Sequence, residues 1–160
     1  RLRKNLTFSY KGQCLEIVKK FTYLGIVFTV GGSFHMTFKL LSGQSLKAMY
    51  ALEKQFIKFP CMSIKHKLDL FDKLILPVLS YGSQVWGLMD SHLLENIHLK
   101  FCKKLLGVKK QTQNNVNYGD LGRTSLKTMR TISFNKYWLK NALSNKTKYI
   151  KIFLCEQIYK

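Results

Sequence analysis

The chain has 160 residues, of which 46% are hydrophobic, and its 27 Lys and Arg against 8 Asp and Glu give a formal net charge of +19 at pH 7. This hydrophobic fraction excludes an intrinsically disordered tail, and the length is sufficient for a buried core. The excess of positive charge indicates a polyanionic partner, such as nucleic acid, an anionic membrane surface or an acidic protein.

The first 30 residues are predicted to form a small antiparallel sheet. Apolar and polar residues alternate from Leu6 to Tyr10, Lys11-Gly12-Gln13 offers a turn, and Cys14 to Val18 can return as a second strand. A third strand is predicted from Tyr23 to Phe28. Gly25 lies inside it, which indicates a bulge, a bend or a close approach of another group to the backbone.

The rest of the chain is predicted to be helical. A first helix follows Gly31-Gly32, with Ser33 as its candidate N-cap, and its apolar stripe stops at Pro60. Ser63 is the candidate cap of a second helix, which Pro77 is expected to kink or split.

A third helix is predicted to start at Asp90 or Ser91 and to stop at Gly107, since glycine suits a helix C-terminus. Three segments are expected after it: a loop over 108–122, a fourth helix over 125–143, and a weaker fifth helix from 146 to the end. The predicted fold class is therefore α+β, mostly α, with a hairpin plus a strand followed by a bundle of about four to five helices. The predicted division is a β element over 1–32, a helical domain over 33–144 and a C-terminal helix over 145–160.

The four cysteines contain no Cys-x-x-Cys pair, which argues against a zinc ribbon or a thioredoxin-like site. No apolar run follows the basic N-terminus, so the sequence shows no signal-peptide pattern. We expect reduced, mostly buried cysteines in an intracellular protein, nuclear or cytoplasmic. Because the first residue is Arg1, we also expect that the chain is a piece of a longer protein.

Carboxylates are too few for metal-dependent phosphoryl transfer, which needs several of them around magnesium. The closest pair, Asp69 and Asp72, is interpreted as charge on the surface of a helix. The histidines lack His-Glu-x-x-His spacing and are interpreted as surface or half-buried residues: His35, His66, His92 and His98. We expect neither a complete active site nor a cofactor in this chain.

Basic residues are interleaved with aromatic ones toward the C-terminus, a pattern suited to phosphate and base contacts. Phe134 and Trp138, four residues apart, are interpreted as the buried stripe of the fourth helix. The first group of candidate nucleic-acid-binding residues is on or just before that helix: Arg123, Lys127, Arg130, Lys136 and Lys140. The second group follows the third helix and its end: Lys100, Lys103, Lys104, Lys109 and Lys110.

Four segments together resemble the C-terminal part of reverse transcriptases from non-LTR (LINE-like) retrotransposons. They are "VKKFTYLGIVFTVGGSF", "LFDKLILPVLSYGSQVWG", "IHLKFCKKLLGVKKQTQN" and "VNYGDLGRTSLKTMRTISFNKYWLK", in the family's order and spacing over most of residues 17–140. Gln84 departs from the pattern, because many relatives carry an acidic residue there, and this difference suggests a decayed copy.

The resemblance implies that Tyr23, Leu24 and Gly25 belong to a primer-grip-like edge of the palm and that the helices form the thumb, which holds the primer–template duplex. It places the catalytic Ala-Asp-Asp box upstream of residue 1, so the Mg²⁺ of a full-length parent would bind to palm residues that are missing here. The chain is then a fragment of an RNA-directed DNA polymerase that binds an RNA/DNA duplex and is inactive alone. The alternative is a stand-alone basic helical module that binds an acidic protein or an anionic membrane surface.

Overall fold

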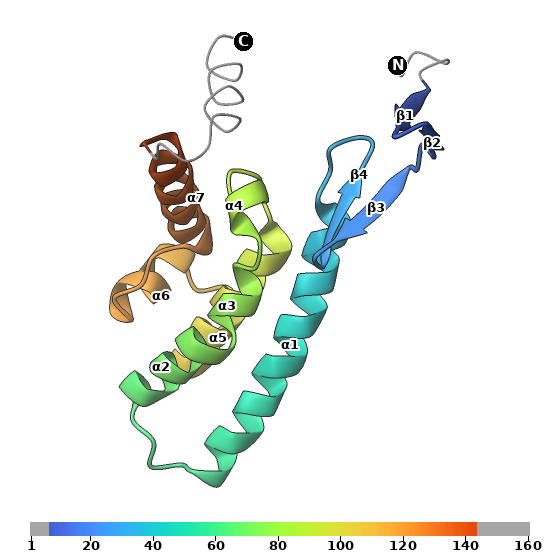
Figure 1. Cartoon of the computed structure of the whole chain (residues 1–160). Helices are drawn as coiled ribbons and strands as arrows, with labels where there is room; N and C mark the ends of the chain where they lie inside the picture. The colour runs from blue at the N-terminus through green and yellow to red at the C-terminus, as the bar shows by residue number, and fades with distance from the viewer. Residues whose placement is uncertain (1–6, 144–160) are drawn as a thin grey trace.

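An N-terminal β arm, residues 8–29, leads into a long helix (Figure 1). The computed structural model describes residues 7–143. The strands are β1 Phe8–Tyr10, β2 Gln13–Leu15, β3 Lys20–Tyr23 and β4 Ile26–Thr29. The helices are α1 His35–Lys58, α2 Ile64–Leu74, α3 Leu76–Leu79, α4 Ser83–Trp86, α5 His92–Leu106, α6 Asn114–Asp120 and α7 Leu126–Leu143. Helices α2, α3 and α5 pack against the long helix α1, while α6 and α7 pack on the side of α5 away from α1 (Figure 1). The α+β, mostly α class is confirmed, and the fifth helix expected from residue 146 lies outside the described residues.

The β arm consists of two separate hairpins, so the prediction of one hairpin and one strand is wrong in this detail. Tyr23 pairs with Ile26, and the two residues between them, Leu24 and Gly25, have positive φ angles of 47° and 78°. Positive φ at both central residues is the signature of a type I′ hairpin turn, which matches the twist of the flanking strands. Gly25 is therefore explained by a turn and not by a bulge, and the approach of Tyr81 does not require glycine, because a β-carbon here would lie 3.6 Å from the Tyr81 ring. The first hairpin uses the same device at Lys11-Gly12, as predicted.

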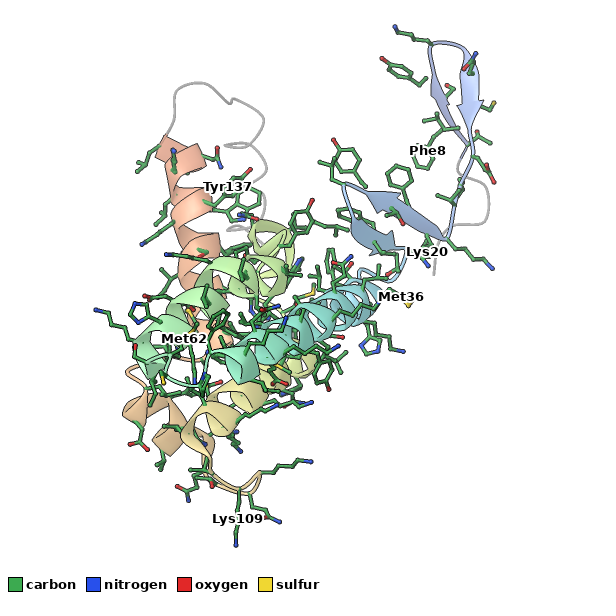
Figure 2. All side chains as sticks on the ribbon, turned by 90° about the horizontal axis from the view of Figure 1, so that it is seen from below. Phe8, Lys20, Met36, Met62, Lys109 and Tyr137 are labelled. Atoms are coloured by element: carbon green, nitrogen blue, oxygen red, sulfur yellow. The ribbon has the colours of Figure 1, made fainter. Side chains whose placement is uncertain are left out.

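The β arm touches the helices through β4 and the turn before it. Ile26 and Val27 are buried, and the Val27 N–H donates to Thr37 Oγ1 of α1 at 2.9 Å. All residues of β1, β2 and β3 are exposed. Figure 2 accordingly shows Phe8 and Lys20 projecting from strands that extend away from the helices.

This exposure predicts how the arm exchanges its amide hydrogens. A two-stranded hairpin without a covering layer is marginal in water, and few buried contacts oppose its local opening. We expect the paired amides of β1 and β2 to exchange much faster than those in the centre of α5, measured by hydrogen–deuterium exchange with NMR. Equal protection of both segments would contradict this expectation.

Most helix boundaries follow from local signals in the sequence. Ser63 caps α2 by accepting the His66 N–H, and Pro77 separates α2 from α3. Gly107 ends α5 with a φ of 68°. Ser33 comes one residue before the N-cap of α1, although its hydroxyl oxygen still accepts the His35 N–H at 3.3 Å. Ser91 is at the N-cap of α5 without capping it, because its side chain is bound elsewhere.

Two short helices were not predicted. The segment 108–122, expected to be a loop, contains α6, whose Asn117 and Tyr118 are buried. Its sequence has no apolar stripe, and it is held instead by polar contacts such as Asn117 Nδ2 to the Gln113 carbonyl at 2.8 Å. The second is α4, where Trp86 is buried and packs edge-on against Phe38 at 5.0 Å between ring centroids.

The core lies between α1 and the layer formed by α2, α3 and α5. The apolar stripe of α1 faces this layer, and the burial of each large apolar side chain contributes about 1.5–3 kcal/mol. Its main members are Phe38, Leu41, Met49 and Leu52 of α1, Phe71 and Ile75 at α2, Leu79 of α3, and Leu94, Ile97 and Phe101 of α5. The tight seam between α1 and α5 positions the basic side chains described next.

Candidate nucleic-acid interface

Two of the five basic residues predicted on the α7 side do not face the solvent. Arg130 is 2% exposed, its guanidinium lies over the Trp86 ring at 5.3 Å, and its Nη1 donates to Ser91 Oγ. Burial lowers the pKa of Arg130 from its ordinary value. Arg130 therefore joins α7 to α4 and α5 and is not accessible to a phosphate in this arrangement.

Arg123 is bound in a similar way just before α7. Its side chain is 10% exposed, and its Nη2 donates to Asp72 Oδ2 at 2.7 Å. The guanidinium also lies over the Phe71 ring at 5.6 Å. This pair fixes the segment between α6 and α7 to α2, so we remove Arg123, together with Arg130, from the candidate interface.

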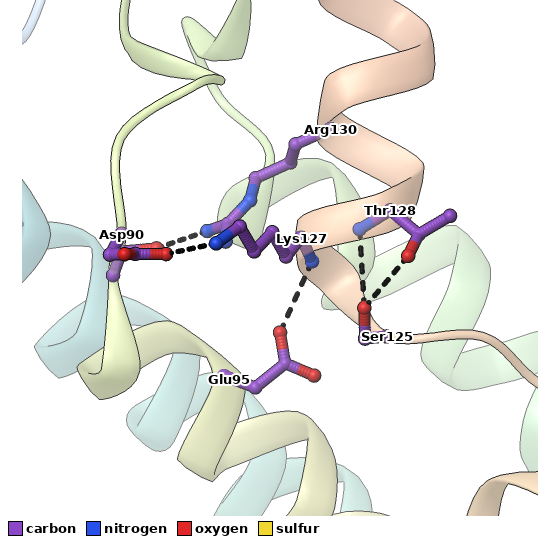
Figure 3. A network of polar contacts seen from close by, with 7 residues as sticks. Asp90, Glu95, Ser125, Lys127, Thr128 and Arg130 are labelled. Atoms are coloured by element: carbon purple, nitrogen blue, oxygen red, sulfur yellow. Dashed lines mark hydrogen bonds and ion pairs between the residues drawn. The ribbon is translucent and has the colours of Figure 1, made fainter.

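A carboxylate that the sequence analysis did not single out holds the start of α7. The two oxygens of Glu95 on α5 accept the backbone N–H groups of Leu126 and Lys127 at 3.1 and 3.2 Å, and Figure 3 shows the contact with Lys127. The Tyr118 hydroxyl donates to the same carboxylate. This contact caps α7 with a negative charge from another helix. Burial first, and then the hydrogen bond to Glu95, raise the pKa of Tyr118.

The lysines of α7 are exposed but differ in their contacts. Lys127 Nζ forms an ion pair with Asp90 at 2.6 Å, and this hydrogen bond and charge hold the pKa of Asp90 below its ordinary value (Figure 3). Lys136 and Lys140 lie one turn apart and have no ion pair within residues 7–143. Phe134 and Trp138, predicted as the buried stripe, are only half-buried; the buried residues of α7 are Leu126 and Arg130. Trp138 donates to the Gln84 carbonyl at 3.0 Å.

The second predicted group forms part of a larger basic face along α1, α2 and α5. Lys100 Nζ donates to the Tyr50 hydroxyl at 2.8 Å, and Lys104 pairs with Glu53 at 2.6 Å. Lys103 Nζ donates to the Lys110 carbonyl at 2.6 Å, which folds the segment after α5 back onto the helix. Two further lysines, Lys54 of α1 and Lys67 of α2, line a pocket between α1, α2 and α5 together with Lys104. We define the lysine surface as these two lysines, the three lysines of α5 and the two that follow α5: Lys54, Lys67, Lys100, Lys103, Lys104, Lys109 and Lys110.

Charge on the lysine surface is almost entirely positive. In the part of the chain that the structure describes, Glu53 is the one carboxylate that forms an ion pair with it. Figure 2 shows Lys109 in the segment after α5, where several side chains with terminal nitrogens point outward. Closely spaced ammonium groups with so few counter-charges favour a polyanion, because binding to one relieves their mutual repulsion.

The predicted primer-grip-like residues lie beside the N-terminal half of α1. Tyr23, Leu24 and Gly25 form the exposed end of the second hairpin, where the Tyr81 hydroxyl donates to the Leu24 carbonyl at 2.7 Å. Leu24 and Gly25 border an apolar pocket of about 600 Å³ between the hairpin, α1 and α3. The same pocket is lined by Leu41 and Gln44 of α1, so these residues lie beside the N-terminal half of α1. Since a helix rises 1.5 Å per residue, Gln44 and Lys54 of the lysine surface are roughly 15 Å apart along α1.

Two other predictions about reactive residues need correction. Cys14 and Cys61 are exposed free thiols, so the expectation of mostly buried cysteines holds among the described residues only for Cys102. Burial raises the pKa of the Cys102 thiol to about 11, which makes it unreactive at neutral pH. His98 is fully buried and not at the surface.

His98 lies in the packed layer between α2 and α6. Its ring stacks on Phe71 and contacts Tyr118, and Arg123 lies 3.4 Å from its Nε2. Burial first, and then the Arg123 charge, lower the pKa of His98 to about 4. Arg123 can only donate, so Nε2 accepts and the proton of the neutral ring is on Nδ1.

The lowered pKa of His98 predicts an acid-dependent loss of stability. The unfolded chain takes up a proton near pH 6.5 and the folded chain only near pH 4, so stability is complete above pH 6.5 and falls as the pH drops. We expect this single group to lower the free energy of unfolding by about 1.5 kcal/mol between about pH 6.5 and about pH 5.

Urea titrations between about pH 6.5 and about pH 5 would measure this loss of unfolding free energy in the wild type, in His98→Gln and in the exposed-site control His35→Gln. The pH-dependent loss of stability should disappear in His98→Gln and persist in the other two proteins. An equal pH dependence in all three proteins would contradict the expectation.

Within residues 7–143, no three His, Cys, Asp or Glu side chains are grouped so that they could hold a metal ion. Asp72 is bound to Arg123, and Asp69 is exposed on α2. No helix among the described residues is long and apolar enough to cross a bilayer. Comparison with protein-family models, with curated proteins and with solved structures finds no match to this chain.

Proposed function

We propose that this chain binds nucleic acid through the lysine surface, as the thumb-like part of a non-LTR reverse transcriptase that grips a primer–template duplex. The observation that carries the proposal is the set of seven exposed or half-exposed lysines on α1, α2 and α5 and the segment after α5, with Glu53 as the one ion-paired carboxylate among the described residues. The four-segment resemblance suggests the family. Catalysis would require the carboxylates that the resemblance places upstream of residue 1, so the chain alone is expected not to extend a primer.

A membrane surface is less well supported as the partner. A helix that lies on a bilayer segregates apolar and basic side chains onto opposite faces. On the outer side of α7, the exposed Ile132 and Leu139 lie on the same face as Lys136 and Lys140, so α7 lacks this segregation. Binding to an acidic protein or to anionic vesicles remains the alternative to nucleic-acid binding.

The salt dependence of duplex affinity tests the proposal. If about five lysines contact phosphates, the logarithm of the affinity should fall with the logarithm of salt concentration with a slope of roughly −4 to −5, because counterions are released. Binding should show little sequence preference, since backbone contacts do not read bases. Replacing Lys100, Lys103, Lys104 and Lys110 by Gln should make the slope shallower by roughly three to four.

The matched control removes the same charge elsewhere, by replacing Lys11, Lys19, Lys20 and Lys39 with Gln. It should lower the affinity slightly and keep the slope. A third variant, Lys136→Gln with Lys140→Gln, measures the contribution of α7. Equal slopes in the first variant and the control would contradict the proposal, as would equally tight binding of anionic vesicles through the same four lysines.

A further inference from the structure

The lysine surface borders a pocket of about 540 Å³ between the C-terminal half of α1, α2 and α5. Its lining is mainly apolar and includes Phe56 and Ile57 of α1 and Phe101 and Leu105 of α5. Ile57 is 79% exposed, an unusually large fraction for an isoleucine beside a hydrophobic core. A volume of this size is in the range of pockets that take small organic groups.

The rim of the pocket selects for a negative charge. Lys54, Lys67 and Lys104 line it against the single carboxylate of Glu53. Lys104 already neutralises Glu53 Oε2 at 2.6 Å, whereas Oε1 is buried and has no hydrogen-bond partner within residues 7–143. The pocket therefore combines an apolar interior with a cationic rim, which suits a ligand with a flat apolar part and a nearby anionic group.

Two aromatic rings of the pocket can stack on a ligand. The ammonium group of Lys67 lies over the Phe56 ring at 5.6 Å, and that of Lys100 lies over the Tyr50 ring at 4.9 Å. Both lysines also belong to the lysine surface. If a phosphate draws these ammonium groups away, the ring faces become free for a base to stack on.

We propose that this pocket takes an unpaired nucleobase of a single-stranded end while the surrounding lysines contact its backbone. This inference rests on the proposed function, because Lys54, Lys67 and Lys104 belong both to the lysine surface and to the pocket. Inside a duplex the bases are stacked and expose only their edges, and a base that remains paired cannot enter the apolar interior. The pocket accordingly adds a preference for a duplex with an overhang over a blunt duplex.

The experiment compares the affinity of one duplex in two forms, blunt and with a short adenine overhang. Stacking of one base should make the overhang form bind roughly 5- to 100-fold more tightly. Phe56→Leu, which keeps an apolar side chain and removes the ring, and Ile57→Ser, at an exposed position, should abolish this advantage while blunt-duplex affinity is unchanged. Phe59→Leu is the matched control, since Phe59 is 58% exposed and does not line the pocket.

A second readout locates the base directly. A 4-thiouracil in the overhang should photo-crosslink to the segment Tyr50–Ile57 or Phe101–Leu105. Equal affinity for both duplex forms, with blunt binding that still depends on the lysines, would overturn the pocket inference and leave the proposed function intact. Saturable binding of dodecanoate that Phe56→Leu abolishes, without any overhang advantage, would reassign the pocket to an acyl anion. Absence of binding to either duplex would overturn both proposals.

Discussion

Replacing Glu95 with alanine is expected to lower the free energy of unfolding by about 3–4 kcal/mol. The carboxylate accepts two backbone N–H groups at the start of α7 and the hydroxyl of Tyr118, and all three donors lose this acceptor in the variant. The substitution also removes a negative charge near the buried guanidinium of Arg130, whose pKa the Glu95 charge raises against the effect of burial. Urea unfolding followed by circular dichroism would measure the loss.

Two further variants separate the cap from a general effect of charge. Glu95→Gln keeps one oxygen acceptor and should have an intermediate effect, while Asp69→Ala, which removes an exposed carboxylate on α2, should change stability by less than about 0.5 kcal/mol. Amide exchange at Leu126 and Lys127 should accelerate in Glu95→Ala more than exchange within α5. A loss no larger than that of Asp69→Ala would show that α7 does not depend on this contact.

The second large effect is expected at Gly87, where α4 meets α7. A β-carbon at this position would lie 2.4 Å from the Ser83 carbonyl oxygen, and 3.2 Å from both the Arg130 carbonyl oxygen and Phe134 Cβ. These neighbours are backbone atoms or atoms next to the backbone, so they cannot rotate away, and overpacking of this kind costs about 3 kcal/mol. Gly87→Ala should therefore destabilise the protein by that amount and loosen α7, as measured by urea unfolding.

Gly43 provides a control in which the same substitution has the opposite sign. It lies in α1 and is exposed, and a β-carbon added to it would have no neighbouring atom within 4 Å. Alanine there reduces the entropy of the unfolded chain and should stabilise the protein by about 0.5–1 kcal/mol. If Gly87→Ala were as well tolerated as Gly43→Ala, the close contact between α4 and α7 would not be a constraint on the fold.

The sequence by itself determined the class of the fold and most of its boundaries. Pro60, Ser63, Pro77 and Gly107 act on the backbone within a few residues of their own positions, so their effects could be predicted without knowledge of the tertiary structure. The turn at Leu24-Gly25 could also have been predicted from the sequence, because it has the same pattern as the turn at Lys11-Gly12, a residue followed by glycine between two strands. The sequence predicts a continuous strand there instead, because the apolar Leu24 fits the strand pattern.

Only the tertiary structure decided which charges are accessible to a partner. Arg123, Arg130 and Glu95 look like solvent-exposed charges in the sequence, and His98 looks like a surface or half-buried residue. In the structure Arg130 and His98 are buried, and Arg123 and Glu95 are half-buried against partners on other elements. A charge is buried when elements distant in the chain supply its partner, and no local pattern records that partner. The lysine surface likewise exists because α1 and α5, which α2, α3 and α4 separate in the chain, pack side by side and bring Lys54 and Lys104 to the same pocket.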